Sequence, residues 1–581
     1  MASKNLLIGA IDFGTTYSGW AFSFLHEYES DPTKASVKQW NSGSGTLTTE
    51  KTPTVALIDP DGKTLTAFGY DAENKYKDLT DTGGYENYFF FRRFKMALHK
   101  KLGEKLDRHL TLEDEMGRSL LAVDVFSLSI QYLMKDMMKV VNSRLSGNFT
   151  QSDIRWVLTV PAIWTDGAKQ FMREAAVQAG IDNDMLSIAL EPEAASLFCR
   201  HLSVESTVDQ KGVSVSQFTA GTRYLVLDAG GGTIDTTVHE VGVDGTIKEI
   251  RAADGGGWGG IMVDREFKNL LVDIFGTETY NAFKKSETED WLDLWRDFEV
   301  KKRSVDPNKD SRINMKLPLS LINMYEEKRK SKLAIAIDAS KYGKSISFAG
   351  DKMKCLPTVF QVLFNNSIDS TISLVKSLVM GANIKAILMV GGYSESPMLQ
   401  EAVKSSFPEL DIIIPIGASS TILRGALVYG HNPKAISERK LRYTYGVKTS
   451  HEFKKGEHPE SKRKTYDTGD RCKDIFSKHV EKNEVVKVGE PQTRQSYHPV
   501  KRNQTSVTFP IYATEQRNPT YTDEVGCKHL GNVKIEIPSS SADPTTRNVW
   551  VSLTFSGTET IVDAEDEMSG KKVKASVNFL G

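Results

Sequence analysis

Short apolar runs alternate with helical periodicity along residues 5–430. One such run, Ile154–Val160, is stopped by a proline. A helical pattern then opens near Thr165 or Asp166 and closes at Gly180, since glycine is common just past a helix end. Another apolar run follows at Leu186–Leu190. Strands that alternate with helices in this way predict an α/β fold built around a largely buried sheet.

The pattern changes after about residue 440, where helical periodicity disappears. Apolar side chains occupy every second position in Val549–Phe555 and again in Val573–Phe579. Short alternating strands separated by turns are typical of an antiparallel sandwich. We therefore expect three parts in the chain: residues 1–430 with inserts at about 51–119 and 266–345, a linker at 431–441, and a β-sandwich at 442–581 in which 452–500 form long loops and no helical lid follows.

Two apolar runs in the first part end in an aspartate and a glycine turn. Ile8–Asp12 leads into Gly14 and a series of hydroxyl side chains, and Tyr224–Asp228 leads into three consecutive glycines and Asp235. Glycine adopts positive φ at little cost, and without a Cβ its backbone N–H groups can close around phosphate oxygens. Asp12 and Asp235 could then hold a hydrated Mg²⁺ between them. The two halves begin alike, which predicts a duplicated fold with its ligand between the halves.

Composition narrows the possible classes of protein. The chain has 581 residues, 39% hydrophobic and 26% charged, and a formal net charge of −1, so neither nucleic acid nor an anionic membrane is an expected partner. No apolar run approaches the length of a membrane span, which is about 20 residues. The four cysteines have no metal-ligand spacing, and we expect them to be reduced in a cytoplasmic protein.

Paired Asp-x-Gly-Thr-like turns also suggest an aspartic protease, whose two loops share one proton. Three observations favour phosphate binding instead: the second turn lacks Asp-Ser/Thr-Gly, both turns lie among predicted helices, and a third glycine turn is present at Gly391-Gly392. Gly255-x-Gly257-x-x-Gly260 matches a dinucleotide fingerprint, but this stretch is rich in glycine. We interpret it as a turn that opens a helix near a phosphate.

Two further charged positions allow two interpretations each. Glu299 lies three and four residues before Lys302 and Arg303, a spacing that serves internal ion pairs on a solvated helix as well as it serves a ligand. Glu191 stands at the end of a predicted strand, where a carboxylate can orient a water or simply cap the following helix.

Taken together, these segments resemble the actin-like ATPase superfamily, and more closely the 70-kDa heat-shock proteins. The motifs Ile11-Asp-Phe-Gly-Thr-Thr-Tyr-Ser, Leu158-Thr-Val-Pro-Ala, Glu191-Pro-Glu-Ala-Ala, Asp228-Ala-Gly-Gly-Gly-Thr-Ile-Asp and Val390-Gly-Gly-Tyr-Ser stand in that family's order. Residues 530–571 resemble its peptide-binding sandwich, and Arg442–Gly446 suggests the atypical heat shock 70 kDa protein 12 branch. The resemblance implies a two-lobed, duplicated actin-like fold followed by an antiparallel β-sandwich.

The resemblance also implies roles for individual residues. ATP or ADP would be held with Mg²⁺, and the metal would be bound through water by Asp12 and Asp235. Glu191 and Asp228 would orient the attacking water. The expected nucleotide contacts are Gly14, Thr15, Thr16, Tyr17, Gly230, Gly231, Gly232, Thr233, Gly259 and Gly260 around the phosphates, and Glu299, Lys302, Arg303, Gly391, Gly392, Tyr393 and Glu395 around the nucleoside.

The sequence departs from the family pattern at four places. The family's catalytic lysine is matched best by Arg93, with Arg92 or Lys95 as alternatives, and an arginine would change how protons are handled. Glu395 stands where the family has a purine-stacking arginine, and no acidic residue occurs near Ser419. The linker also lacks the family's run of leucines and valines.

The expected function is Mg²⁺-dependent ATP binding with slow hydrolysis, as in heat-shock chaperones of the stress response. Binding of unfolded polypeptide by the sandwich would be coupled to the nucleotide. The alternatives are a nucleotide-gated adaptor with little hydrolysis and, less favoured, a small-molecule kinase on the same fold.

Overall fold

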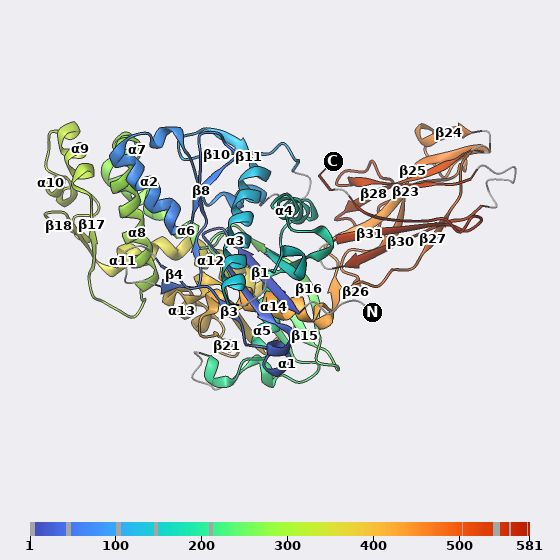
Figure 1. Ribbon diagram of the computed structural model, residues 1–581, viewed down its shortest axis with the longest axis horizontal. Helices are drawn as coiled ribbons and strands as arrows, with labels where there is room; N and C mark the ends of the chain where they lie inside the picture. The colour runs from blue at the N-terminus through green and yellow to red at the C-terminus, as the bar shows by residue number, and fades with distance from the viewer. Residues whose placement is uncertain are drawn as a thin grey trace.

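The computed structural model describes residues 6–41, 48–99, 106–144, 149–207, 213–466, 468–501, 504–538, 547–556, 559–577 and 579–580. Its mixed α/β part lies at one end of the long axis and its C-terminal strands at the other (Figure 1). Within the described ranges, no helix combines the length and apolar character needed to cross a membrane. The four cysteines are free thiols, as expected.

The first sheet carries the first aspartate–glycine turn. Its main path runs in the order β13 (Leu186–Leu190), β12 (Ile154–Val160), β1 (Leu7–Phe13), β2 (Tyr17–Phe24) and β3 (Ser36–Val37), with β6 (Thr52–Pro53) also paired to β2. β1 is parallel to β12 and antiparallel to β2. All seven residues of β1 are buried, as expected for a strand covered on both faces.

The second sheet repeats this arrangement. Its order is β21 (Asp411–Ile413), β20 (Ala386–Val390), β14 (Arg223–Ala229), β15 (Ile234–Val241) and β16 (Ile247–Gly256), continued by β22 (Ile436–Lys440) and β26 (Val485–Lys487). β14 is parallel to β20 and antiparallel to β15, as β1 is to β12 and β2. The two aspartate–glycine turns therefore occupy equivalent places in two sheets of the same topology.

Alternating side chains of the two central strands enter different apolar cores. Leu7, Ile11 and Phe13 of β1 pack with α3 (Ala122–Arg144) and α4 (Asp166–Gln178). The intervening Ile8 and Ala10 belong to a core shared with α5 (Glu191–Cys199), α14 (Thr421–His431), β14 and β20. α5 and α14 thus lie between the sheets and join them, which fixes the relative position of the two glycine turns.

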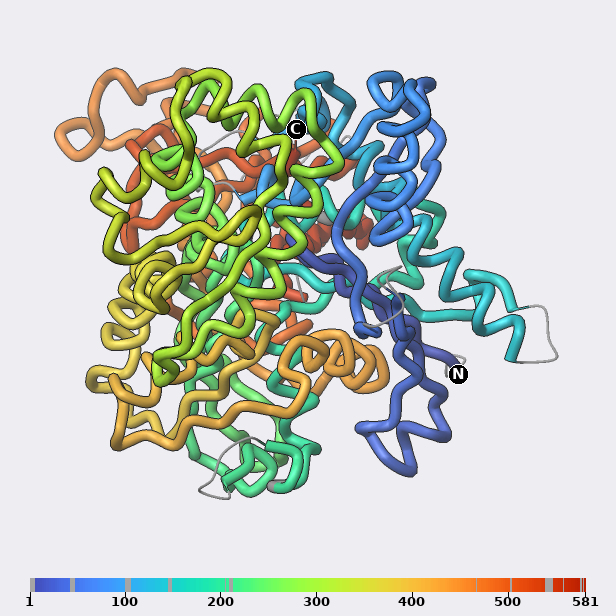
Figure 2. Tube along the Cα trace, turned by 90° about the vertical axis from the view of Figure 1, so that its left-hand side faces the viewer, coloured from blue at the N-terminus to red at the C-terminus, as the bar shows by residue number. Residues whose placement is uncertain are grey.

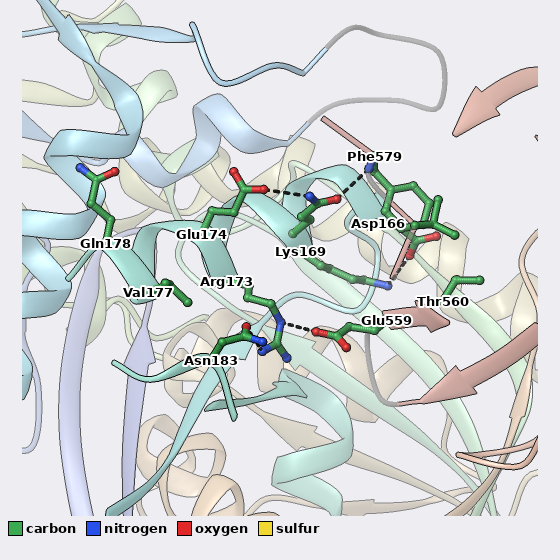
Figure 3. A pocket seen from close by; sticks show the side chains of 12 residues that line it. Asp166, Lys169, Arg173, Glu174, Val177, Gln178, Asn183, Glu559, Thr560 and Phe579 are labelled. Atoms are coloured by element: carbon green, nitrogen blue, oxygen red, sulfur yellow. Dashed lines mark hydrogen bonds and ion pairs between the residues drawn. The ribbon is translucent and has the colours of Figure 1, made fainter. Parts of the chain in front are cut away.

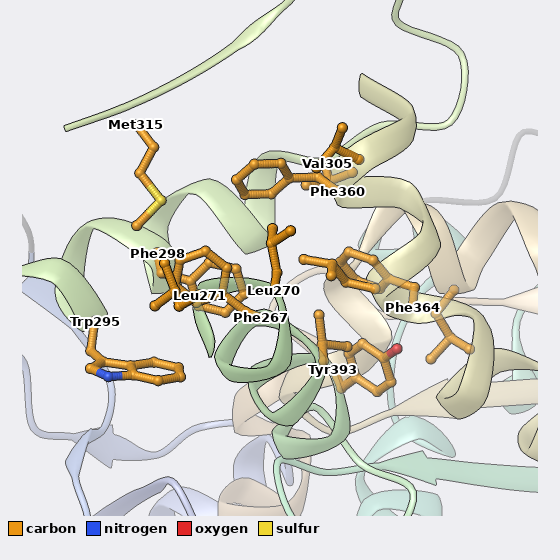
Figure 4. Close-up of a cluster of buried hydrophobic side chains, with 14 of the residues drawn as sticks. Phe267, Leu270, Leu271, Trp295, Phe298, Val305, Met315, Phe360, Phe364 and Tyr393 are labelled. Carbon is orange, nitrogen blue, oxygen red and sulfur yellow. The ribbon is translucent and has the colours of Figure 1, made fainter. Parts of the chain in front are cut away.

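The outer face of the second sheet carries a third core, drawn in part in Figure 4. It contains α6 (Ile261–Phe275) and α8 (Thr288–Ser304), where Phe267 stacks on Phe298 with ring centroids 3.8 Å apart. The helical insert continues through α7 (Thr277–Ser286), α9 (Leu319–Arg329) and α10 (Leu333–Asp338), and this region faces the viewer in Figure 2. The earlier insert forms β7 (Val55–Ile58), β8 (Leu65–Phe68), α2 (Tyr70–Thr82) and β9 (Phe89–Arg92).

The C-terminal part consists of two antiparallel sheets with one common apolar core. One sheet has the order β24 (Arg463–Tyr466), β25 (Gly469–Val480), β23 (Thr444–Glu452), β28 (Ser506–Thr514) and β29 (Lys528–Glu536), and the other has β27 (Gln495–Tyr497), β30 (Val549–Ser556), β31 (Glu559–Asp566) and β32 (Lys572–Ser576). The expectation of long loops at 452–500 is wrong, since β24 to β27 lie there. β25 has charged residues on its half-buried face, which obscured its alternation.

The segment expected as a linker is strand-forming over part of its length. β22 pairs in parallel with β16, and Arg439 donates through Nε to Glu193 Oε1 of α5 at 2.7 Å. Further contacts join the C-terminal sheets to α4: Tyr445 OH donates to Asp166 Oδ2 at 2.9 Å, and Arg173 pairs with Glu559 at 2.5 Å. A cavity of about 450 Å³ lies at this junction (Figure 3).

Candidate functional site

The two glycine turns contact each other. A Cβ added at Gly231 would lie 2.1 Å from Thr16 Oγ1, and one at Gly232 would lie 2.4 Å from Thr15 Oγ1. Any side chain at these two glycines would therefore overlap the opposite turn. The absence of a Cβ allows the approach that the sequence pattern predicted for the two turns.

A cavity of about 490 Å³ opens beside the paired turns. It is lined by most of the residues named from the sequence: Asp12, Gly14, Thr15, Thr16, Tyr17, Glu191, Asp228, Gly230, Gly231, Gly232, Thr233, Gly260, Glu299, Lys302, Arg303, Gly391, Gly392, Tyr393 and Glu395. The lining also includes Lys95, which the sequence offered as an alternative to Arg93. Further lining residues were not assigned to the site from the sequence: Thr49, Glu50, Lys51, Phe364, Ser396, Gly417, Ser419 and Ile422. Arg93, Gly259 and Asp235 are not among the lining residues.

Three buried carboxylates lie close together beside the cavity, and two of them, Glu191 and Asp228, line it. Glu191, Asp228 and Asp235 each place an oxygen within 4.8 Å of the others. Strand register brings two of them together, because Asp228 of β14 is directly opposite Asp235 of β15. Burial raises the pKa of Asp228 well above its ordinary value, with Glu191 and Asp235 adding to the effect. Burial likewise raises the pKa of Asp235 to about 8.

This acidic cluster fits a divalent cation. Asp228 Oδ1 is buried without a hydrogen-bond partner among the described residues, and the Asp235 oxygens make no hydrogen bond of good geometry there. Such groups are costly when buried unless they are protonated or bound to a cation. Carboxylate oxygens are also the ligands that Mg²⁺ prefers. Glu191, Asp228 and Asp235 are therefore the residues that could hold a metal.

Asp12 lies outside this trio, in contrast to the predicted pairing of Asp12 with Asp235 around one metal. Its Oδ1 accepts a hydrogen bond from Thr159 Oγ1 at 2.9 Å, and its Oδ2 accepts one from Lys51 Nζ at 2.5 Å. Both carboxylate oxygens of Asp12 already have a partner. Asp12 therefore lies next to the trio as a carboxylate whose charge is paired with Lys51. This pairing could not be predicted from the sequence, because Lys51 lies 39 residues further along the chain.

Lys95, named from the sequence as an alternative to Arg93, lines the cavity, whereas Arg93, the preferred match to the family's catalytic lysine, does not. Lys95 is 1% exposed, and its Nζ lies 2.8 Å from Glu191 Oε1. Arg93 instead pairs with Asp264 of α6 at 2.7 Å. The backbone turns sharply at Arg93, where φ is +54°, before a 3₁₀ turn at Phe94–Leu98 that includes Lys95. This local turn could not be anticipated from the basic-aromatic sequence alone.

The glycine-rich stretch before α6 is hydrogen-bonded to the second glycine turn. The N–H groups of Gly259, Gly260 and Ile261 donate to the carbonyls of Gly232, Gly230 and Gly231, respectively. These donors were expected to face a phosphate, but the neighbouring turn already uses them. A Cβ at Gly259 would lie 2.5 Å from Gly230 O, which explains why glycine is required there.

The charged residues at the end of α8 form internal ion pairs and also line the cavity, so both interpretations of their spacing apply. Lys302 Nζ lies 2.7 Å from both Asp264 and Glu299, and Arg303 pairs with Glu299 at 3.0 Å. Burial alone would raise the pKa of Glu299, but these ion pairs lower it to about 2. Arg303 also lies over the Tyr17 ring, 4.9 Å from its centroid. The internal ion pairs therefore exist, and they form one wall of the cavity.

A second wall begins where β20 ends. Gly391 has φ +84°, and a Cβ there would lie 2.4 Å from Asp228 Oδ1, so glycine is required on both counts. Tyr393 stacks on Phe364, with ring centroids 6.4 Å apart (Figure 4). Glu395 is exposed at the rim and accepts a hydrogen bond from Ser419 N at 3.0 Å.

Two sheets of equal topology, whose glycine turns meet beside a cavity lined by buried acids, define the fold of the actin-like ATPase class. Comparison with known proteins narrows this class. The Hsp70 protein family matches residues 127–431, more than half of the chain. The chain belongs to the Hsp70 family.

Its similarity to the atypical branch extends over nearly the whole length, as the resemblance predicted. The chain is 33% identical to mouse heat shock 70 kDa protein 12A, covering 99% of this chain and 92% of the relative. It is 31% identical to human heat shock 70 kDa protein 12B, covering 99% and 91%. Similarity to chaperone protein DnaK 3 of Synechococcus sp. is 27% and covers 47% of this chain and 37% of that protein.

Proposed function

We propose that this protein binds ATP and ADP with Mg²⁺ in the cleft between the two glycine turns and hydrolyses ATP slowly. The observation that carries the proposal is the cleft itself: the paired glycine turns line one cavity with Glu191 and Asp228, whose carboxylates lie close to that of Asp235. Among the described residues, Asp228 Oδ1 has no hydrogen-bond partner. A triphosphate needs backbone donors and a cation at the same place, and this cleft combines both.

The chain's own residues would bind and orient the nucleotide. Backbone N–H groups of Gly14–Tyr17 and Gly231–Thr233 would hold the terminal phosphates from opposite sides. Glu299, Lys302 and Arg303 would contact the nucleoside. Mg²⁺, when bound at Glu191, Asp228 and Asp235, would neutralise phosphate charge at the reacting end.

Glu191 and Lys95 are the residues placed to handle the attacking water. Their side chains are 2.8 Å apart and buried. Burial raises the pKa of Glu191, while Lys95 counteracts that rise. A carboxylate held in this way can accept a hydrogen bond from water and orient it, and the ammonium can stabilise the charge that develops on phosphate.

Phosphate release from ATP tests this proposal. The wild type should release phosphate only slowly and only with Mg²⁺, and Asp235→Asn should abolish release while Asp369→Asn, an exposed substitution on α12 (Asn365–Val379), should not change it. Equal rates for wild type and Asp235→Asn would overturn the hydrolytic part. Nucleotide binding without turnover would instead identify a nucleotide-gated adaptor.

We further propose that the C-terminal sheets bind unfolded polypeptide and respond to the nucleotide. A continuous path supports the coupling: Glu191 belongs to the acidic cluster, and two residues later on α5 the buried Glu193 pairs with Arg439 of β22. The test is the affinity for a permanently unfolded polypeptide in ATP and in ADP. Equal affinities would contradict the coupling.

A further inference from the structure

A second lysine reaches the reacting end of the cleft. Lys51 lies between β5 (Thr48–Thr49) and β6, lines the cavity, and has a side chain that is 15% exposed. Its Nζ is 2.5 Å from Asp12 Oδ2. Asp12 immediately precedes the first glycine turn, so this ammonium stands next to the backbone that would hold phosphate.

The local fold makes a place for this lysine. β6 pairs with the start of β2, so that Thr52 is opposite Ser18. Gly19, the next residue of β2, is opposite Asp12 on β1. A Cβ at Gly19 would lie 2.9 Å from Glu50 O and 3.1 Å from Lys51 Cγ. The missing side chain at Gly19 therefore leaves the space through which the Lys51 stem reaches Asp12.

The charges around Lys51 keep it protonated. Burial alone would lower its pKa, but the attraction of Asp12, and then of Glu191 and Asp228, raises it above the ordinary value. Lys51 and Lys95 thus each neutralise one acid of the cleft, at Asp12 and Glu191 respectively. Glu191, Asp228 and Asp235 remain the acids that could hold a cation, with one oxygen of Glu191 bonded to Lys95.

We infer that Lys51 is a phosphate-binding residue of the first glycine turn, whose fixed positive charge lets the cleft retain nucleotide when Mg²⁺ is removed. The inference rests on the proposed nucleotide binding. An ammonium has three donors, so Lys51 can keep its bond to Asp12 while it donates to a phosphate oxygen. Lysine binds phosphate as a compact point charge and does not require the planar geometry of arginine.

Calorimetric titration with ADP and ATP, in excess Mg²⁺ and in EDTA, tests this inference. The wild type should bind in both buffers. Lys51→Met should lose about 10–100-fold in affinity in EDTA, the range expected for a charge-assisted hydrogen bond, and should lose less in Mg²⁺. Lys51→Arg, which retains the charge, should bind more tightly than Lys51→Met in EDTA.

The matched control removes a similar ion pair elsewhere. Lys38 pairs with Asp136 at 2.6 Å and is not part of the cavity lining, so Lys38→Met should bind nucleotide as the wild type does. Should Lys51→Met fold poorly because Asp12 is left unpaired, the double variant Asp12→Asn/Lys51→Met removes both charges. Its affinity in EDTA should also fall by about 10–100-fold.

The results separate the two proposals. If wild type binds nucleotide in Mg²⁺, and neither Lys51→Met nor the double variant loses affinity in EDTA, the role of Lys51 is overturned and nucleotide binding remains intact. If wild type binds nucleotide only when Mg²⁺ is present, the role of Lys51 is likewise overturned and nucleotide binding remains intact. No wild-type binding in either buffer overturns the proposed function and this inference with it.

Discussion

Asp235→Asn should stabilise the metal-free protein, and the gain should grow with pH. Burial raises the pKa of Asp235 to about 8 in the folded state, whereas an unfolded aspartate has a pKa of about 3.9. Between these values the folded protein binds a proton that the unfolded chain does not. The contribution of Asp235 to the free energy of unfolding is therefore fully present below about pH 4 and is lost as pH rises towards 8.

The size of the effect follows from the shift. Each pH unit above the unfolded pKa costs about 1.4 kcal/mol, so the loss at pH 5 is about 1–2 kcal/mol and the loss at pH 7 about 4 kcal/mol. Asparagine carries no charge and requires no proton. The stability advantage of Asp235→Asn should accordingly increase by about 3 kcal/mol between pH 5 and pH 7.

Thermal unfolding in EDTA at pH 5, 6 and 7 measures this difference. The midpoint of Asp235→Asn minus that of wild type should rise with pH by an amount on the order of a few degrees. Asp369→Asn on the surface of α12 serves as the control and should show no such trend. A constant difference across the three pH values, or an advantage that shrinks as pH rises, would refute the assignment of the buried charge. Added ATP and Mg²⁺ should stabilise wild type but not Asp235→Asn.

Three further substitutions examine other parts of the molecule. Lys95→Met should slow phosphate release by about 100-fold while nucleotide still binds, because its ammonium acts on charge developing at the phosphate; unchanged turnover would contradict this. Gly231→Ala should abolish stabilisation by ATP in a thermal-shift assay, because its Cβ would lie 2.1 Å from Thr16 Oγ1; an unchanged shift would mean that the turns need not approach. Arg439→Met should destabilise the protein by about 3–5 kcal/mol, because Glu193 is left buried without its partner, and denaturant unfolding would show the loss.

Much of the cleft could be predicted because its signals are local. The turns at Gly14 and at Gly230–Gly232 need glycine for close backbone approach, and each follows a strand whose residues are apolar on both faces. These requirements can be recognised from residues that are adjacent in the sequence. The helix that begins after Thr165 was equally readable, since the Thr165 side chain accepts a hydrogen bond from Ala168 N and caps the helix.

Within residues 5–430, the sequence by itself determined the alternation of strands and helices and the chemistry of the two turns, because each depends on residues that are close together in the chain. Only the tertiary structure decided which lysine side chain pairs with which carboxylate. Lys51 reaches Asp12 through the space above Gly19, and Lys95 reaches Glu191 from 96 residues away. These pairings depend on how separate strands come together, and an ion pair leaves no pattern in the sequence that identifies its partner.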